Sequence, residues 1–160
     1  AAIPEYRVPG NGKESTEMVV GTEWIVDADG CRAEDLRSVE KLDAVFKRIV
    51  RELGLHSAGP TQWRQFPGPG GVTGLQLLTE SHLTCHTYPE YATATFNLYC
   101  CRERPTWPWT ERLAEMLGAR DVRVRTCMRG STEATANTSA QPEIARNAAP
   151  ARLRSGRARS

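Results

Sequence analysis

Four side chains that can do chemistry lie within six residues near the middle of the chain: Ser81, His82, Cys85 and His86. A serine or cysteine beside a histidine is typical of enzymes that attack carbonyl carbons with an activated hydroxyl or thiol. The sequence has no GxSxG motif and no segment that supplies a third member of a catalytic triad, so it does not favour a hydrolase. A loop whose histidines only support the structure is the simpler interpretation of this spacing.

The stretch 91–101 adds two adjacent cysteines whose surroundings should differ. Read as a strand, it alternates between two faces. One face carries Ala92, Ala94, Phe96, Leu98 and Cys100, and the other carries Tyr91, Thr93, Thr95, Asn97, Tyr99 and Cys101. We therefore expect Cys100 to pack in an apolar layer. We expect Cys101 to lie among hydroxyl and amide groups, where a thiol can transfer protons.

Strands and helices predicted on either side must position these residues. The clearest element is a helix over 38–54, because its apolar residues fall on one face and a glycine ends it. A second helix is predicted to begin near Thr106 or Thr110 and to end at Leu117. Strands are predicted over 22–28, 62–66, 72–79, 91–101 and 121–128. The stretch 80–90 is predicted to be a loop.

This order of elements is typical of an α+β two-layer sandwich, with two helices on one face of an antiparallel or mixed sheet. The other face or an edge then needs a cover, which a second subunit could supply. We predict a flexible leader over 1–20, one folded domain over 21–130 and a disordered tail over 131–160. The tail holds five arginines against two glutamates, and its composition favours a solvated segment over a nucleic-acid-binding arm.

Composition argues against several functional classes. The net charge of +2 gives no strong attraction to nucleic acid or membranes, and no run approaches the roughly 18 apolar residues of a membrane span. The five cysteines include an adjacent pair but no CxxC motif, which argues against both a disulfide framework and a zinc site. We therefore expect a cytoplasmic protein with reduced thiols and no metal.

The run 71–101, GVTGLQLLTESHLTCHTYPEYATATFNLYCC, resembles the processing and active-site segment of prokaryotic S-adenosylmethionine decarboxylases. That family combines GVSG, a short apolar strand, ESH, a histidine five residues beyond the serine, a Pro-Glu pair and a cysteine twenty residues beyond the serine. Ser81, His86, Glu90 and Cys101 fall at these spacings. A weaker likeness extends over 22–130.

The resemblance implies a proenzyme that cuts itself between Glu80 and Ser81 and converts Ser81 into a pyruvoyl group, its cofactor. In the family, the serine hydroxyl attacks the preceding carbonyl, and loss of the serine α-proton then releases the carboxylate. The family's base corresponds to His86, and its processing hydroxyl to Thr73, where the family has serine. The pyruvoyl carbonyl forms a Schiff base with the substrate amine and acts as an electron sink. The proton donor to the product matches Cys101.

The implied substrate is S-adenosylmethionine, decarboxylated for polyamine (spermidine) biosynthesis. Glu90 matches the carboxylate that holds the ribose hydroxyls, and Phe66 matches the aromatic ring that stacks on adenine. If 73–81 were one extended strand, Thr73 and Ser81 would lie about 26 Å apart, too far to share a site within one chain. Family members build each site across a dimer interface, so we expect a homodimer of cleaved protomers.

Three other functions stay open. Relatives of this fold decarboxylate arginine or a similar basic amino acid with the same pyruvoyl chemistry, and Tyr88, where the family commonly has tryptophan, leaves room for such a substrate. A paralogue that does not process could serve as a regulatory subunit, and Thr73 is the one residue that hints at it. Nucleic-acid binding through the tail would be steeply salt-dependent.

Overall fold

The computed structural model describes residues 19–130. Its strands are β1 (Gly21–Asp29), β2 (Gln62–Gln65), β3 (Val72–Leu78), β4 (Ser81–Tyr88), β5 (Thr93–Cys100) and β6 (Asp121–Arg129). Its helices are α1 (Ala33–Arg37), α2 (Val39–Glu52) and α3 (Trp109–Leu117), and a 3₁₀ turn, η1 (Pro89–Tyr91), joins β4 to β5. Most of the predicted leader, 1–18, and the predicted tail, 131–160, lie outside the described residues.

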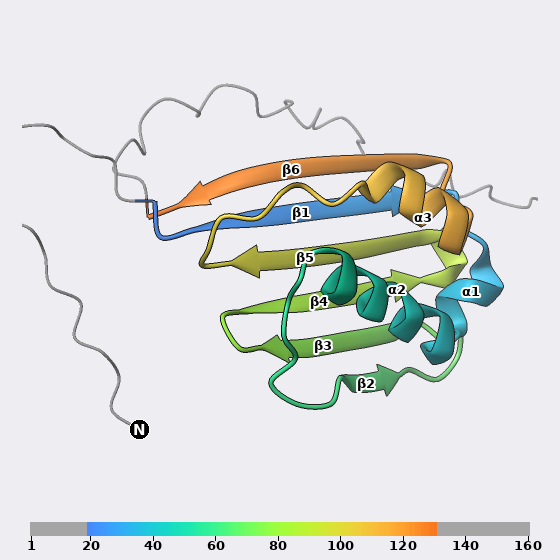
Figure 1. Cartoon of the computed structure of the whole chain (residues 1–160). Coiled ribbons are helices and arrows are strands. Elements are labelled where there is room, and N and C mark those ends of the chain that lie inside the picture. The colour runs from blue at the N-terminus through green and yellow to red at the C-terminus, as the bar shows by residue number, and fades with distance from the viewer. Residues whose placement is uncertain (1–18, 131–160) are drawn as a thin grey trace, which may run out of the picture.

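The strands form one antiparallel sheet in the order β2-β3-β4-β5-β1-β6, and α2 and α3 lie on the same face of it (Figure 1). The core lies between these two layers, where Trp24, Leu83, Phe96 and Leu98 of the sheet meet the helices. The predicted α+β two-layer sandwich is therefore confirmed, with a sheet that is wholly antiparallel. Within the described residues, no helix is both long and apolar enough to cross a membrane.

Helix α2 packs on the sheet through the residues that predicted it. Its fully buried residues are Leu42, Val45, Phe46 and Ile49. The Ser38 side chain accepts the backbone N–H of Lys41 at 3.2 Å and so caps the first turn. Gly54, at φ +60°, turns the chain away just beyond the helix. The predicted start and end of this helix are confirmed.

The other helices differ in part from the prediction. The five-residue helix α1 was not predicted, because so short a segment shows no helical periodicity. Helix α3 begins at Trp109, one residue before the later of the two predicted starts, since Pro105 and Pro108 disfavour helix before it. It ends at Leu117 as predicted, and Gly118 adopts the left-handed conformation, φ +71°, that a helix end favours.

The prediction of a loop over 80–90 is wrong, because most of that stretch is strand β4. A two-residue turn at 79–80 joins β4 to β3, and β4 pairs along its length with both β3 and β5. Its inward positions are Leu83, Cys85 and Thr87. Only Leu83 is strongly apolar, so the sequence shows no clear alternation of apolar and polar residues along this strand. Thr87 is buried because its hydroxyl donates to the Leu36 carbonyl at 2.8 Å and accepts from the Val72 N–H at 2.8 Å.

The face of the sheet opposite the helices, here called the open face, has no cover among residues 19–130. Its side chains include Thr73, Leu75 and Leu77 of β3, His82, Thr84, His86 and Tyr88 of β4, and Thr95, Asn97 and Tyr99 of β5. Leu75 is 43% exposed and Leu77 is 62% exposed. Such apolar exposure beside polar groups is typical of a surface that meets a partner.

At the sheet edge, ion pairs join β6 to β1 across the open face. Arg125 contacts Asp27 at 3.1 Å and Arg123 contacts Asp29 at 2.7 Å, while Arg129 pairs with Glu23. A hydrogen bond from Asn97 and the nearby Arg129 hold the pKa of Glu23 below its ordinary value. These charges help to fix the register of a strand whose side chains are mostly exposed.

Candidate functional site

The predicted site residues fall into two groups at opposite ends of β4. Ser81 pairs with Leu78 and with Cys100, whereas His86 pairs with Thr73 and with Thr95. Five residue steps of about 3.3 Å separate Ser81 from His86 by about 16 Å along the strand. We call Glu80, Ser81, Cys100 and Cys101 the cleavage end. We call Phe66, Thr73, His86, Tyr88 and Glu90 the histidine end.

The prediction that 73–81 could form one extended strand is wrong, but its consequence, that Thr73 and Ser81 of one chain cannot share a site, still holds. Residues 73–81 do not form one extended strand, because the chain turns back at 79–80. Thr73 therefore lies about as far from Ser81 as His86 does, about 16 Å rather than about 26 Å. Thr73 and Ser81 of one chain still cannot act on the same atom.

At the cleavage end, the Glu80 carbonyl oxygen accepts a hydrogen bond from the backbone N–H of Cys101 at 3.4 Å. Ser81 follows directly and begins β4, and its register places its side chain on the same side of the sheet as Cys100. The cleft between these residues measures only about 10 Å³, about the size of one water molecule. Within the described residues, this cleft has no room for a ligand larger than a water molecule.

Cys100 packs in the core as predicted, but Cys101 lies beyond the last residue of β5 and lines the cleft with Glu80 and Ser81 rather than the face that carries Thr95 and Asn97. Cys100 is 2% exposed within the core, and Cys101 is exposed just beyond the end of β5. Burial raises the pKa of the Cys100 thiol, while a hydrogen bond with Ser81 and the charge of Arg104 act in the opposite direction. All five cysteines of the sequence lie in the described part of the chain and are free. In that part, no three His, Cys, Asp or Glu side chains gather as metal ligands.

The buried thiols Cys31 and Cys85 are poor candidates for chemistry. Burial raises the pKa of Cys31 to about 11 and that of Cys85 to about 12. Neither thiol forms an appreciable amount of thiolate near neutral pH, so neither is a nucleophile. Of the four chemically active side chains in 81–86, Cys85 is therefore part of the core, and Ser81, His82 and His86 remain as candidates.

At the histidine end, Thr73 Oγ1 and His86 Nδ1 lie 2.5 Å apart and share a hydrogen bond across the β3–β4 ladder. When Nδ1–H donates to Thr73, Nε2 keeps its lone pair and can take up a proton. The His86 ring lies between two aromatic rings, 5.7 Å from the centre of Phe66 and 4.6 Å from that of Tyr88. The sequence could not predict this contact, since Phe66 belongs to the loop after β2.

A cavity of about 300 Å³ opens beside this histidine and brings together the residues predicted to hold a nucleoside. Phe66, His86, Tyr88 and Glu90 line it, with prolines of the loop 67–71 at its rim. An aromatic ring and a carboxylate that line one small cavity suit a ligand with a flat ring and neighbouring hydroxyl groups. Phe66 and Glu90 are both exposed and so are reachable from solvent.

A second hollow, of about 340 Å³, lies on the open face. Thr73, Thr84, His86, Asp27 and Asn97 are among the residues that line it. Thr73 and His86 can therefore be approached from the open face, and His86 also from the cavity around Phe66. The exposed surface of this hollow is mostly apolar, although the side chains of Thr73, His86 and Asn97 line it.

Sequence reasoning missed two arginines at the cleavage end. Arg102 Nη2 contacts Glu80 Oε1 at 2.7 Å, and Arg104 Nη2 lies 4.0 Å from Glu80 Oε2. The available signal was their position directly after the two cysteines, in the run CCRER at 100–104. Their partner could not be foreseen, because it depends on how the β3–β4 turn meets the end of β5.

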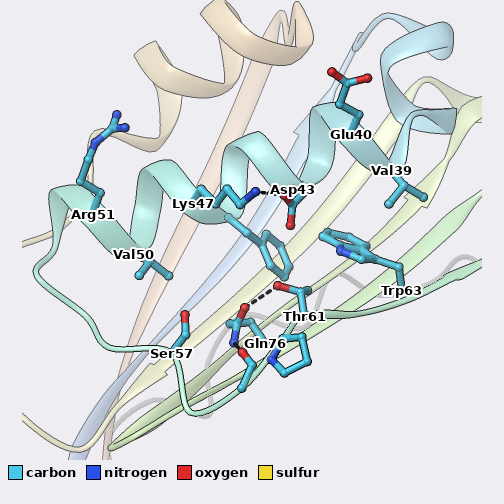
Figure 2. A pocket seen from close by; sticks show the side chains of 13 residues that line it. Val39, Glu40, Asp43, Lys47, Val50, Arg51, Ser57, Thr61, Trp63 and Gln76 are labelled. Carbon is cyan, nitrogen blue, oxygen red and sulfur yellow. Dashed lines mark hydrogen bonds and ion pairs between the residues drawn. The ribbon is translucent and has the colours of Figure 1, made fainter.

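A larger cavity, of about 730 Å³, lies between α2 and the β2–β3 edge, away from both ends of β4 (Figure 2). Figure 2 shows Lys47 paired with Asp43 above it and Trp63 and Thr61 around it. Its one buried polar side chain, Gln76, accepts from Thr61 and donates to the carbonyls of Gly59 and Leu77, at 2.9 Å each. Both the oxygen and the nitrogen of the Gln76 amide are hydrogen-bonded, so the residues described around this cavity include no buried polar side chain that lacks a partner.

Comparison with known proteins identifies similar sequences and a similar structure. The sequence model of the S-adenosylmethionine decarboxylase family matches residues 22–130. An S-adenosylmethionine decarboxylase proenzyme from Syntrophomonas wolfei is 30% identical over 119 residues, 71% of this chain and 90% of the relative. One from Geobacillus kaustophilus is 33% identical over 105 residues, 63% of this chain and 76% of the relative. The crystal structure of the adenosylmethionine decarboxylase from Aquifex aeolicus has a TM-score of 0.60 at 25% identity, and the match covers 74% of this chain and 98% of that one.

Proposed function

The chain belongs to the S-adenosylmethionine decarboxylase family, and from this premise we propose that it is a self-processing decarboxylase of S-adenosylmethionine. Its product would supply aminopropyl groups to polyamine (spermidine) biosynthesis in the cytoplasm. The proposed cofactor is a pyruvoyl group that forms from Ser81 when the chain cuts itself after Glu80. The relatives are named proenzymes, which supports a processing step.

The observation that carries this proposal is the hydrogen bond at the peptide bond to be cut. The Cys101 N–H points at the Glu80 carbonyl oxygen, where it polarises the carbonyl and would stabilise negative charge when a nucleophile adds. The pyruvoyl group keeps the three carbon atoms of residue 81 and takes its new carbonyl oxygen from water. The residues fit it if a serine directly follows a polarised carbonyl, and Ser81, half-buried just after the turn at 79–80, meets that requirement.

The cut needs a nucleophile and a base. Ser81 Oγ gives up its proton and adds to the Glu80 carbonyl carbon; the bond to the Ser81 nitrogen breaks and the nitrogen takes up a proton, which leaves an ester. A base then removes the α-proton of residue 81, the electron pair forms a Cα–Cβ double bond, and the Glu80 carboxylate leaves. One water molecule finally replaces the amine, which departs as ammonia. We assign the base to His86, which the Thr73 hydroxyl orients.

After processing, the pyruvoyl group supplies a carbonyl that takes up electrons as carbon dioxide leaves the substrate. Phe66 would stack on the adenine ring, and Glu90 would accept hydrogen bonds from the ribose hydroxyls. Cys101 would return a proton to the carbon that has lost carbon dioxide. Its exposure at the cleavage end supports this role over that of the buried Cys100.

We propose that two chains complete each site. In one chain the base and the nucleophile lie about 16 Å apart, so the His86 that acts on Ser81 must come from elsewhere. The uncovered open face, with its exposed leucines and a hollow beside Thr73 and His86, supports a homodimer of cleaved protomers. In a symmetric dimer, each chain would give a cleavage end to one site and a histidine end to the other.

The test of this function is the release of carbon dioxide from carboxyl-labelled S-adenosylmethionine, arginine and ornithine by the purified protein. We expect release from S-adenosylmethionine alone, because Phe66 in this cavity offers an aromatic face on which adenine can stack. Release from arginine alone would contradict the proposed substrate and favour the basic amino acid. Glu90 would then pair with a guanidinium group rather than with ribose.

The proton donor can be tested by separate replacement of the two adjacent cysteines. Cys101→Ala is expected to process normally but to lower kcat about 100-fold or more, because a positioned proton donor is lost. Cys100→Ala is expected to keep most of the activity and to lose about 1 kcal/mol of folding stability through the buried sulfur. Turnover and thermal denaturation of the cleaved variants measure both effects. The opposite pattern would assign the proton transfer to Cys100, which contacts Ser81.

A further inference from the structure

Glu80, the residue before the proposed cut, has its side-chain carboxylate held between two arginines. Arg102 contacts one carboxylate oxygen at 2.7 Å, and Arg104 lies 4.0 Å from the other. The side chain of Arg104 is only 27% exposed, and its Nε is buried without a hydrogen-bond partner among residues 19–130. A buried guanidinium N–H without an acceptor is costly, so this N–H is placed to donate a hydrogen bond to a further oxygen atom.

We propose that Arg102 and Arg104, here called the arginine clamp, are positioning residues for self-cleavage that offset the negative charge at residue 80. This inference rests on the proposed function. The proposed role concerns the self-cleavage step, in which the two arginines line the cleft beside Glu80 and Ser81 and lie outside the cavity around Phe66. Together with the Cys101 N–H, the clamp surrounds residue 80 with positive charge and hydrogen-bond donors.

The charge changes during the cut explain why a clamp is needed. When Ser81 Oγ adds to the Glu80 carbonyl carbon, the carbonyl electrons move to oxygen and form an oxyanion on a residue that already carries a carboxylate. When the ester breaks, the bonding electrons leave with the Glu80 acyl oxygen, so residue 80 ends with two carboxylates. Two arginines balance these two charges, and the unpartnered Nε of Arg104 gives the new carboxylate a donor.

If Arg102 and Arg104 only stabilised the fold, their removal would lower the melting temperature without a specific effect on the rate of cleavage. The side chain of Arg102 is 69% exposed and that of Glu80 is 33% exposed, and ion pairs so open to solvent add little folding stability. Removal of Arg102 should therefore slow cleavage and leave the melting temperature almost unchanged. Arg104, only 27% exposed, also contributes packing, which a lysine replacement keeps in large part.

The test compares the cleavage rates of freshly synthesised full-length chains by denaturing gel and intact mass. Arg102→Ala/Arg104→Ala is expected to cut about tenfold more slowly than wild type, and Arg102→Lys/Arg104→Lys to recover most of the rate because it keeps the charges. The matched control is Arg48→Ala/Arg112→Ala, which removes two arginines that hold the two oxygens of Glu115 far from the cut. It should cut at the wild-type rate.

A double-mutant cycle with Glu80→Gln separates the interaction of the arginines with the Glu80 carboxylate from their other effects on cleavage. In a Glu80→Gln background the side-chain charge is absent, so removal of both arginines should slow cleavage only about threefold. An undiminished tenfold loss in that background, or a wild-type rate for Arg102→Ala/Arg104→Ala, overturns the clamp and leaves the proposed function standing. A wild-type chain that never cuts overturns the proposed function, and the clamp with it.

Discussion

Ser81→Ala is expected to leave the chain whole, at its full mass of 17.7 kDa, and to abolish decarboxylation. The hydroxyl of Ser81 is the only group of that residue that can attack the Glu80 carbonyl, and alanine cannot form the ester from which the carboxylate leaves. Wild type is expected to give two fragments of about half the chain. A denaturing gel with intact mass spectrometry on freshly purified protein measures this result.

The mass of the second fragment shows which chemistry made the cut. Self-processing replaces the amine of residue 81 by a carbonyl, so the fragment should be lighter by one ammonia than simple hydrolysis would leave it, and its first residue should react as a ketone. Ser57→Ala, which removes an exposed hydroxyl elsewhere, should cut like wild type. Two fragments from Ser81→Ala would contradict the assignment. An intact wild-type chain would favour the regulatory paralogue.

Local patterns predicted the parts of the structure that local forces determine. Helix α2 follows from the spacing of Leu42, Val45 and Ile49 and from its Ser38 cap, and all of these are seen. The alternation along β5 predicted Cys100 on the covered face, where it is buried. Cys101 is exposed because it lies just beyond the end of the strand. The family spacing selected Ser81, His86, Glu90 and Cys101 as candidate site residues, and the fold divides them between the two ends of β4.

The features that the sequence did not reveal depend on contacts between distant segments. Strand β4 was missed because Cys85 and Thr87 fill inward positions, and Thr87 is accepted there only through its hydrogen bond to Leu36 on α1. The pairing of Arg102 with Glu80 depends on the β3–β4 turn lying against the end of β5. The separation of about 16 Å between Ser81 and His86 follows only once the segment between them is known to be a strand and not a loop.

Because His86 and Ser81 of one chain lie so far apart, the effect of removing His86 on cleavage depends on which chain of a dimer supplies the base. His82 is the histidine nearest to Ser81 in sequence, yet its ring stacks on Tyr99 at 5.6 Å on the open face, while Ser81 shares a side with Cys100. His86 has the orienting hydroxyl of Thr73. We therefore expect His86→Ala to stop cleavage and His82→Ala, the matched control on the same strand, to allow it.

Co-synthesis of His86→Ala with Ser81→Ala should then restore cleavage, although each variant alone stays intact. In a mixed dimer, the Ser81 of the first variant meets the His86 of the second, so one complete site forms. With equal amounts and random pairing, about half of the His86→Ala chains should be cut and none of the Ser81→Ala chains. Tags of different mass identify the cut chain on one gel. If the mixture stays whole while His86→Ala alone is inactive, the base acts within its own chain, and the turn at 79–80 must then move far enough to bring Ser81 to it.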